Sequence, residues 1–177
     1  MRSRYKINET GQIYFITCTI IEWIPVFTRK PSIGILIDSL AFCRLNKGLK
    51  IFAYVILDNH LHLLLSGDNL SNTIKDLKRH TAREIINLAQ KEEKSWLLNQ
   101  FKYYKRKHKS DSDYQVWQEG FHPQQIISEE MLRQKIEYIH HNPVRIGLVE
   151  KAEDWLYCSA RNYLDFESVI EIDALEL

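Results

Sequence analysis

Two histidines, His60 and His62, stand one residue apart at the start of an apolar run that continues through Leu65. Such a run indicates a β-strand, and a strand directs alternate side chains to the same face, so both imidazoles should point together. Two converging imidazoles provide half of a site for a divalent metal ion. A metal site of this kind would suit chemistry on a phosphate, because the ion can polarise it for attack.

A second pair of chemically useful side chains lies in a helix expected to begin at Ser128 and to end near Asn142, since the next residue is proline. At roughly 100° per residue, Tyr138 lies about 100° or more from the centre of the apolar stripe of this helix. Asn142 is one turn further on and shares a face with Tyr138. The helix could therefore offer a phenol nucleophile and an amide ligand to the histidine pair. The stripe consists of Leu132, Ile136 and Ile139.

This combination of ligands favours phosphoryl transfer. Two neutral imidazoles and one amide oxygen add no negative charge to a divalent ion and leave coordination positions open for a phosphate. A phenol is a weak nucleophile, but it can attack a metal-polarised phosphorus and retain the bond energy as a phosphotyrosine ester. That ester could be passed to another DNA end without external energy.

Three strands that would position these groups are predicted from β-branched and aromatic runs at residues 13–21, 51–57 and 61–65. Asp58-Asn59 is a turn-prone pair that suits a tight hairpin between the last two. Residues 114–127 resemble a fourth strand, although Gly120 and Pro123 make it irregular.

Helical spacing predicts one helix from Pro31 to Gly48 and a second that Ser71 caps. Residues 92–112 lose this periodicity and are expected to form a long loop or an irregular helix. The order β, α, β, β, α, β, α predicts an α+β sandwich, with the helices covering one face of an antiparallel sheet.

The 177 residues, 45% hydrophobic and 27% charged, describe an ordinary globular domain, expected at residues 1–164. No apolar run is long enough to cross a bilayer, so we expect a cytoplasmic protein without a membrane partner. Three widely separated cysteines predict reduced thiols. Residues 165–177 are expected to form an acidic tail with Asp165, Glu167, Glu171, Asp173 and Glu176.

The net charge of +1 hides local basic groups that could contact DNA phosphates. Four have helical spacing in the second helix: Lys75, Lys78, Arg79 and Arg83. Lys105 and Arg106 lie in a basic cluster with two tyrosines, which suits single-stranded nucleic acid but is also typical of a solvated loop. Arg145, just after the helix of Tyr138, could touch a phosphate as well.

Several motifs together resemble a single-tyrosine HUH transposase, and most of all the REP-associated tyrosine transposases of bacteria. They are His60-Leu61-His62, the run Tyr-Ile-His-His-Asn-Pro-Val-Arg at 138–145, Trp-Gln-Glu-Gly-Phe at 117–121, and Gly147-Leu148-Val149. The resemblance extends from about residue 14 to residue 163, and the first two motifs are specific in this order.

The resemblance implies a ferredoxin-like sandwich, with an antiparallel sheet of about four strands, and an enzyme that uses Mg or Mn. Such an enzyme binds hairpins in single-stranded DNA, REP-like or at element ends, and cleaves and rejoins the strand through a 5′-phosphotyrosine. His60 and His62 match the metal-binding pair, Tyr138 the nucleophile, and Asn142 the residue that completes the metal site. Relatives outside this branch tend to have Gln there. The protein could also form a homodimer, which the resemblance does not decide.

Two other interpretations remain at this point. One is a non-catalytic ferredoxin-like module that binds nucleic acid on sheet aromatics, for which Tyr14, Phe15, Phe52 and Tyr54 are the candidates. The other is a zinc hydrolase, which would need a third His, Cys or carboxylate ligand, and no H-E-x-x-H or C-x-x-C string supplies one. The neighbouring His140 and His141 are expected to be solvated.

Overall fold

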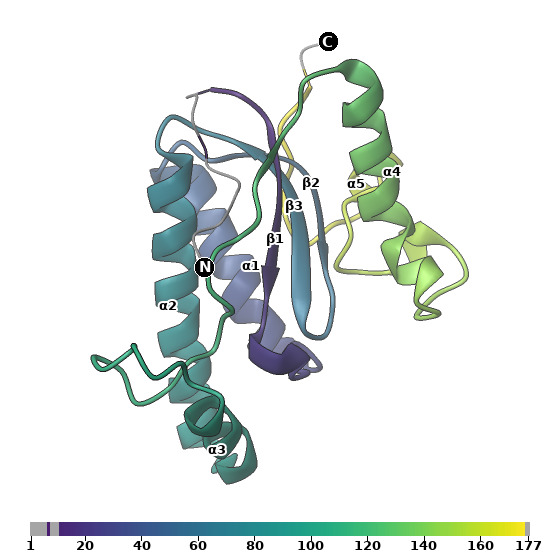
Figure 1. Ribbon diagram of the computed structural model, residues 1–177. Helices are drawn as coiled ribbons and strands as arrows, with labels where there is room; N and C mark the ends of the chain where they lie inside the picture. The colour runs from purple at the N-terminus through teal and green to yellow at the C-terminus, as the bar shows by residue number, and fades with distance from the viewer. Residues whose placement is uncertain (1–6, 8–10, 176–177) are drawn as a thin grey trace.

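The computed structural model describes residue 7 and residues 11–175. Its centre is a four-stranded antiparallel sheet in the order β2-β3-β1-β4 (Figure 1). The strands are β1 (Tyr14–Thr19), β2 (Lys50–Ile56), β3 (His60–Ser66) and β4 (Gln124–Gln125). Helix α1 (Lys30–Asn46) connects β1 to β2, and α2 (Leu70–Lys91) follows β3. This is the β-α-β-β-α-β arrangement of ferredoxin-like folds, so the predicted α+β class is confirmed.

Helices cover both faces of the sheet, which corrects the expectation that they cover only one. Helices α1 and α2 lie on one face and α4 (Glu129–Arg145) on the other (Figure 1). The reason is that the central strands are apolar on both sides: Tyr54 and Leu63 join the core of α1 and α2, whereas Val55 and Leu64 join the core of α4. An apolar sheet face left in water would lose the free energy of burial, so both faces are covered.

The tight connection between β2 and β3 is confirmed, and β3 begins at His60. The amide of Leu57 donates to the His60 carbonyl at 2.9 Å across the turn. On the other side of β3, β1 pairs so that Thr17 lies opposite His62 and Thr19 opposite His60. The sheet thus sets both histidines on the central strand pair, facing α4.

The ends of two helices differ from the predictions. Ser128 caps α4 as expected, accepting from the Met131 amide at 3.1 Å. However, α4 continues to Arg145 with Pro143 inside it, because Pro143 is buried and its packing outweighs the loss of one hydrogen bond in the last turn. Helix α2 begins at Leu70, so Ser71 lies inside the helix and is not its cap.

The region between α2 and α4 contains a regular helix, α3 (Ser95–Tyr103), where a loop or irregular helix was expected. Its Phe101 is fully buried and fixes it to the core. The fourth strand is irregular as predicted: positive φ angles at Gly120 and His122 interrupt it, and only Gln124–Gln125 pairs as a strand with β1. Short helical turns complete the chain, η1 (Ile21–Trp23), η2 (Ala152–Asp154) and α5 (Ala160–Tyr163).

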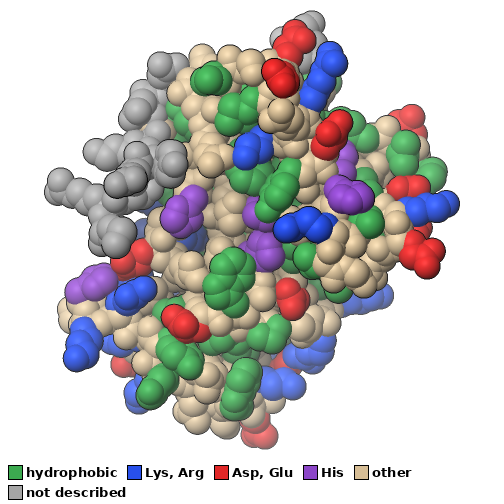
Figure 2. Space-filling model, turned by 45° about the vertical axis from the view of Figure 1, so that its right-hand side comes forward, with side chains coloured by type: hydrophobic (Ala, Val, Ile, Leu, Met, Phe, Trp, Pro, Cys, Tyr) green, Lys and Arg blue, Asp and Glu red, His purple; other side chains and the backbone are tan. Residues whose placement is uncertain are grey.

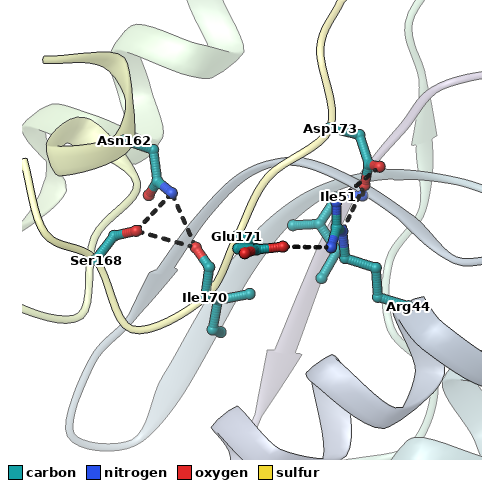
Figure 3. A network of polar contacts seen from close by, with 7 residues as sticks. All are labelled: Arg44, Ile51, Asn162, Ser168, Ile170, Glu171 and Asp173. Carbon is teal, nitrogen blue, oxygen red and sulfur yellow. Dashed lines mark hydrogen bonds and ion pairs between the residues drawn. The ribbon is translucent and has the colours of Figure 1, made fainter. Parts of the chain in front are cut away.

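The described part of the acidic tail folds back onto the domain along β2 (Figure 3). The backbone amide of Asp173 donates to the Ile51 carbonyl at 2.7 Å, and the Asp173 carboxylate accepts from the Ile51 amide at 2.9 Å. The same carboxylate holds Arg44 through two nitrogens at 3.0 and 3.2 Å. Ile170 is buried, so this segment protects the edge of β2. The acidic Glu176 lies outside the described residues. Among the described helices, none combines the length and apolarity that a bilayer span requires.

Candidate active site

His60 and His62 converge on the face of the sheet that α4 covers, as alternation along β3 predicted. Their ring centroids are 4.9 Å apart. His60 Nδ1 lies 2.7 Å from the Asn59 side-chain oxygen, and His62 Nδ1 lies 2.8 Å from the Thr17 hydroxyl. An amide oxygen only accepts, so His60 donates from Nδ1 and its Nε2 retains a lone pair for a ligand. Figure 2 shows histidines beside hydrophobic and basic side chains in the middle of this face.

Both histidines are held in the neutral form that binds metal. Burial, together with smaller effects of the nearby His60 and the cations of Arg145 and Lys135, lowers the pKa of His62 to about 3. Burial also lowers the pKa of His60, where the effect of Arg145 adds to it and Asp58 opposes it. An uncharged imidazole has a free lone pair, so no proton must be displaced when a cation binds at neutral pH.

Tyr138 lies directly against the histidine pair. Its ring is 5.2 Å from the His62 ring and 5.8 Å from the Phe15 ring, in edge-on contacts. The guanidinium of Arg145 lies 5.6 Å from the centre of the phenol ring. The side chain is 40% exposed, so a DNA strand arriving from solvent could reach the hydroxyl. All of these contacts arise within one chain.

Asn142 is the buried member of the group. At about 100° per residue it lies roughly 40° from Tyr138 and 60° from the buried Ile139, which places it between the site and the core. It is 1% exposed, and neither its amide nitrogen nor its amide oxygen has a hydrogen-bond partner among the described residues. An unpaired buried amide is costly and rare in native proteins. A bound cation is the type of partner that Asn142 Oδ1 lacks.

The donor set lacks the third His, Cys or carboxylate ligand that a zinc site in a protein normally has. Within the described residues, no cluster of three or more His, Cys, Asp or Glu side chains could hold a metal. The zinc-hydrolase interpretation therefore lacks its third ligand. Two imidazoles and one amide oxygen, by contrast, leave positions open for water and phosphate on an ion such as Mg or Mn.

Four residues contact the site that were not predicted from the sequence to lie beside the histidines or Tyr138. Lys135 lies 4.4 Å from the Phe15 ring and, with Arg145, provides a cation on α4 on either side of Tyr138 in sequence. Its position one turn before Tyr138 was a usable signal. Thr17 and Phe15 gave no such signal, because their contacts with His62 depend on the register of β1 against β3. The fourth residue is Trp23, whose ring is 5.4 Å from that of His60.

The residues predicted to bind DNA are spread over two sides of the molecule. Arg145 lies at the site, whereas the basic residues of α2 and of the loop after α3 lie across the sheet from α4 (Figure 1). Lys75, Arg79 and Arg83 are exposed. Lys105 donates to the Lys109 carbonyl at 2.7 Å, and the Arg106 amide donates to the Gln115 side chain at 3.0 Å, which orders the loop.

Lys78 has a different role from its neighbours on α2. Its ammonium donates to the carbonyl oxygens of Gln118, at 2.7 Å, and of Gly120. Burial lowers its pKa, as expected for an ammonium withdrawn from water. The structure therefore assigns Lys78 to fixing the segment before β4 and removes it from the surface available to a phosphate.

His140 is not solvated as expected, whereas His141 is exposed. His140 Nε2 lies 2.9 Å from the Ser159 hydroxyl, and its ring packs 4.8 Å from that of Tyr163. Burial lowers its pKa to about 4. His140 thus connects α4 to α5 on the side of the helix away from Tyr138.

Comparisons with known proteins agree with the motifs. No family model matches the chain. A Haemophilus influenzae protein described as "Putative REP-associated tyrosine transposase" is 32% identical over 111 residues, which cover 60% of this chain and 56% of that protein. The chain thus matches little more than half the length of this curated relative.

Among solved structures, a REP-associated tyrosine transposase bound to a REP hairpin superposes with a TM-score of 0.66 at 16% identity, covering 99% of this chain and 96% of that one. This likeness establishes a shared fold. A Deinococcus radiodurans structure described as a putative transposase gives a lower TM-score of 0.44 at 19% identity, over 77% of this chain and 95% of that one. The expected resemblance to REP-associated tyrosine transposases is confirmed.

Proposed function

We propose that this protein is a transposase of the single-tyrosine type, which binds hairpins in single-stranded DNA and cleaves and rejoins the strand through Tyr138. The observation that carries the proposal is the contact between a half-exposed phenol and a pair of neutral histidines, with ring centroids 5.2 Å apart between Tyr138 and His62. One helical turn away lies Asn142, a buried amide that has no hydrogen-bond partner among the described residues. The curated relative and the shared fold support the same conclusion.

A divalent ion, Mg or Mn, would be held by the nitrogens of His60 and His62 and by Asn142 Oδ1. Once bound, it would polarise the scissile phosphate and offset the charge that develops on its oxygens. His60 and His62 need not lose protons for this, and Asn142 would gain the partner that its oxygen lacks. The hydrogen bonds of His60 with the Asn59 side-chain oxygen and of His62 with the Thr17 hydroxyl would keep the two rings turned toward the ion.

In the cleavage step, the Tyr138 oxygen attacks the phosphorus. The new bond joins the tyrosine to the 5′-phosphate, and the bond from phosphorus to the 3′ oxygen breaks. The electron pair leaves with the 3′ oxygen, which takes up a proton, while the phenol releases its proton to solvent. Lys135 and Arg145 flank the nucleophile and would stabilise the charge on the phosphate in the transition state. Attack by another 3′-hydroxyl on the phosphotyrosine would rejoin the strand.

The stem of a hairpin would be held by phosphate contacts, which are independent of sequence and sensitive to salt. Lys75, Arg79 and Arg83 on α2, with Lys105 and Arg106 in the loop after α3, are the proposed contacts away from the site. They lie across the sheet from Tyr138, so one strand must pass around an edge of the sheet to reach both. A homodimer, in which one copy holds the stem that the other cleaves, would solve the same problem. Light scattering of the DNA complex separates these arrangements.

The alternative, a module that binds bases on the aromatics of its sheet, loses support from burial. Tyr14 and Tyr54 are 1% and 0% exposed, and Phe15 and Phe52 are buried as well. Base stacking needs an open aromatic face. Helices cover both faces of this sheet, so these rings are unavailable to bases.

The test uses labelled single-stranded oligonucleotides that carry the hairpins flanking the protein's own gene. With Mn present, we expect a cleaved strand and a labelled protein band that survives denaturation. With the metal chelated, both should disappear while hairpin binding persists. Equal binding with and without Mn, together with no labelled protein under either condition, would instead favour a non-catalytic binding module.

A further inference from the structure

Trp23 is a large aromatic side chain held in water at the rim of the site. It is 56% exposed, although Ile21 and Ile24 on either side of it in the chain are buried. The chain achieves this with φ angles of 49° at Glu22 and 55° at Trp23, a left-handed conformation that non-glycine residues rarely adopt. Strained backbone of this kind persists where its surroundings fix it, and it clusters at functional sites.

The turn that exposes Trp23 is tied to the histidine pair. Asn59 donates from its side-chain nitrogen to the Trp23 carbonyl at 3.1 Å, and its side-chain oxygen lies 2.7 Å from His60 Nδ1. One amide therefore orients both the tryptophan turn and the His60 ring. The indole meets the His60 ring edge-on, with centroids 5.4 Å apart and the planes at 77°.

Four rings follow one another across the site. Tyr138 lies 5.2 Å from His62, His62 lies 4.9 Å from His60, and His60 lies 5.4 Å from Trp23. The nucleophile and the exposed indole thus contact different members of the histidine pair. A phosphate held at the pair would have Tyr138 beside one histidine and Trp23 beside the other.

We propose that Trp23 is a stacking platform for the base of the nucleotide that departs when the strand is cut, an inference that rests on the proposed function. In phosphoryl transfer the attacking and leaving oxygens lie roughly in line through phosphorus. With Tyr138 on one side, the nucleotide bearing the departing 3′ oxygen lies on the other, where the indole is. Stacking there holds the new 3′-hydroxyl close to the phosphotyrosine for the return reaction. Trp23 is a positioning residue and does not touch the reacting phosphorus.

The chain offers a matched control in Trp96, which is 62% exposed and lies on α3 among residues such as Glu92 and Leu97, away from the histidines. Trp23→Ala and Trp96→Ala remove the same group from two exposed positions. The probe is the oligonucleotide with the gene-flanking hairpin, either intact or with an abasic residue at the nucleotide just 5′ of the mapped cut. Readouts are the affinity for DNA in a Tyr138→Phe background, the yield of rejoined strand, and Mn affinity.

Trp23→Ala should weaken binding of the intact strand by about 10-fold or more and lower rejoining more than first cleavage, while Trp96→Ala changes neither. Trp23→Phe should restore most of the binding. On the abasic strand, Trp23→Ala should cause no further loss, because the base that it stacks on is already missing. Mn affinity should be unchanged by Trp23→Ala. A fall in Mn affinity would be expected if Trp23 only supported the His60 ring.

A loss with Trp23→Ala that is equal on intact and abasic strands would overturn the assignment, as would a loss matched by Trp96→Ala or a fall in Mn affinity. If the tyrosine adduct forms normally and Trp23→Ala has no effect, this inference fails and the transposase function stands. If no strand yields an adduct, the abasic residue is placed at each position beside the hairpin in turn. One position at which Trp23→Ala causes no further loss then means that the proposed cleavage fails and that Trp23 stands as a base-binding contact. The absence of such a position overturns the platform as well.

Discussion

Asn142 is a buried residue whose side-chain amide has no hydrogen-bond partner among the described residues, and the proposed bound cation would supply one. The side chain is 1% exposed, between the buried Ile139 and Pro143 of the same helix. Desolvating an amide without a hydrogen bond costs free energy in the metal-free protein. A residue that lowers stability in the absence of its ligand is a typical compromise at a functional site.

We therefore expect Asn142→Leu to raise the free energy of unfolding in EDTA by about 1 kcal/mol, because the unpaired amide is removed. The same change should abolish the extra stability that Mn gives the wild type, which grows with metal concentration above its Kd. Urea unfolding with and without Mn measures both. Asn162→Leu is the matched comparison and should destabilise, since the Asn162 amide donates to Ser168 and Ile170 at 2.8 and 2.9 Å. A less stable Asn142→Leu protein in EDTA would show that Asn142 already has a partner in the fold.

Helix α2 carries two lysines, Lys75 and Lys78, whose different roles could not be predicted from the sequence. Lys75 is exposed, whereas Lys78 holds the carbonyls of Gln118 and Gly120. Both lysines fit the polar side of an amphipathic helix. Lys78 finds its acceptors only because the segment before β4 packs against α2 in the folded protein. The helix therefore combines a candidate phosphate-binding surface with a support for the strand that borders β1.

Lys78→Met should lower the free energy of unfolding by about 1.5–3 kcal/mol, the usual worth of hydrogen bonds to a charged group. Lys75→Met should stay within about 0.5 kcal/mol of the wild type, as surface changes do. The two substitutions should have the opposite ranking in their effect on DNA binding. Lys75→Met should reduce the slope of log affinity against log salt by about 1, and Lys78→Met should leave this slope unchanged. Denaturant titration and salt-dependent binding give the two numbers. A salt slope that falls with Lys78→Met would return that lysine to the DNA surface.

On the scale of the whole molecule, much of the fold and half of the site follow from local patterns. Strand alternation brought His60 and His62 together, and helical spacing paired Tyr138 with Asn142. The expectation that helices cover one face of the sheet was wrong, although residues 51–57 and 61–65 are apolar without alternation, which is typical of strands buried on both sides. The residues that contact the two histidines could not be predicted from the sequence. Thr17 requires the register of β1 with β3, and Trp23 requires two non-glycine residues at positive φ.

The folded-back tail is another feature of the whole chain, and its acidic residues differ in importance. Asp173 bonds to Arg44 and to the Ile51 amide, whereas the Glu171 side chain is 86% exposed in its contact with Arg44. Asp173→Ala should cost about 1–3 kcal/mol of unfolding free energy, because a backbone amide loses its acceptor. Glu171→Ala should cost almost nothing, as exposed ion pairs do. Equal losses in thermal or urea unfolding would mean that charge alone holds the tail.

In the proposed reaction Tyr138 becomes joined to DNA, and intact-mass spectrometry of the protein after incubation with the hairpin oligonucleotide and Mn detects this adduct. The wild type should gain the mass of the 3′ fragment of the cut strand. Tyr138→Phe should gain none while binding the hairpin with unchanged affinity, and Tyr103→Phe, which alters an exposed tyrosine of α3, should behave as the wild type. A DNA adduct that persists in Tyr138→Phe would show that another residue is the nucleophile.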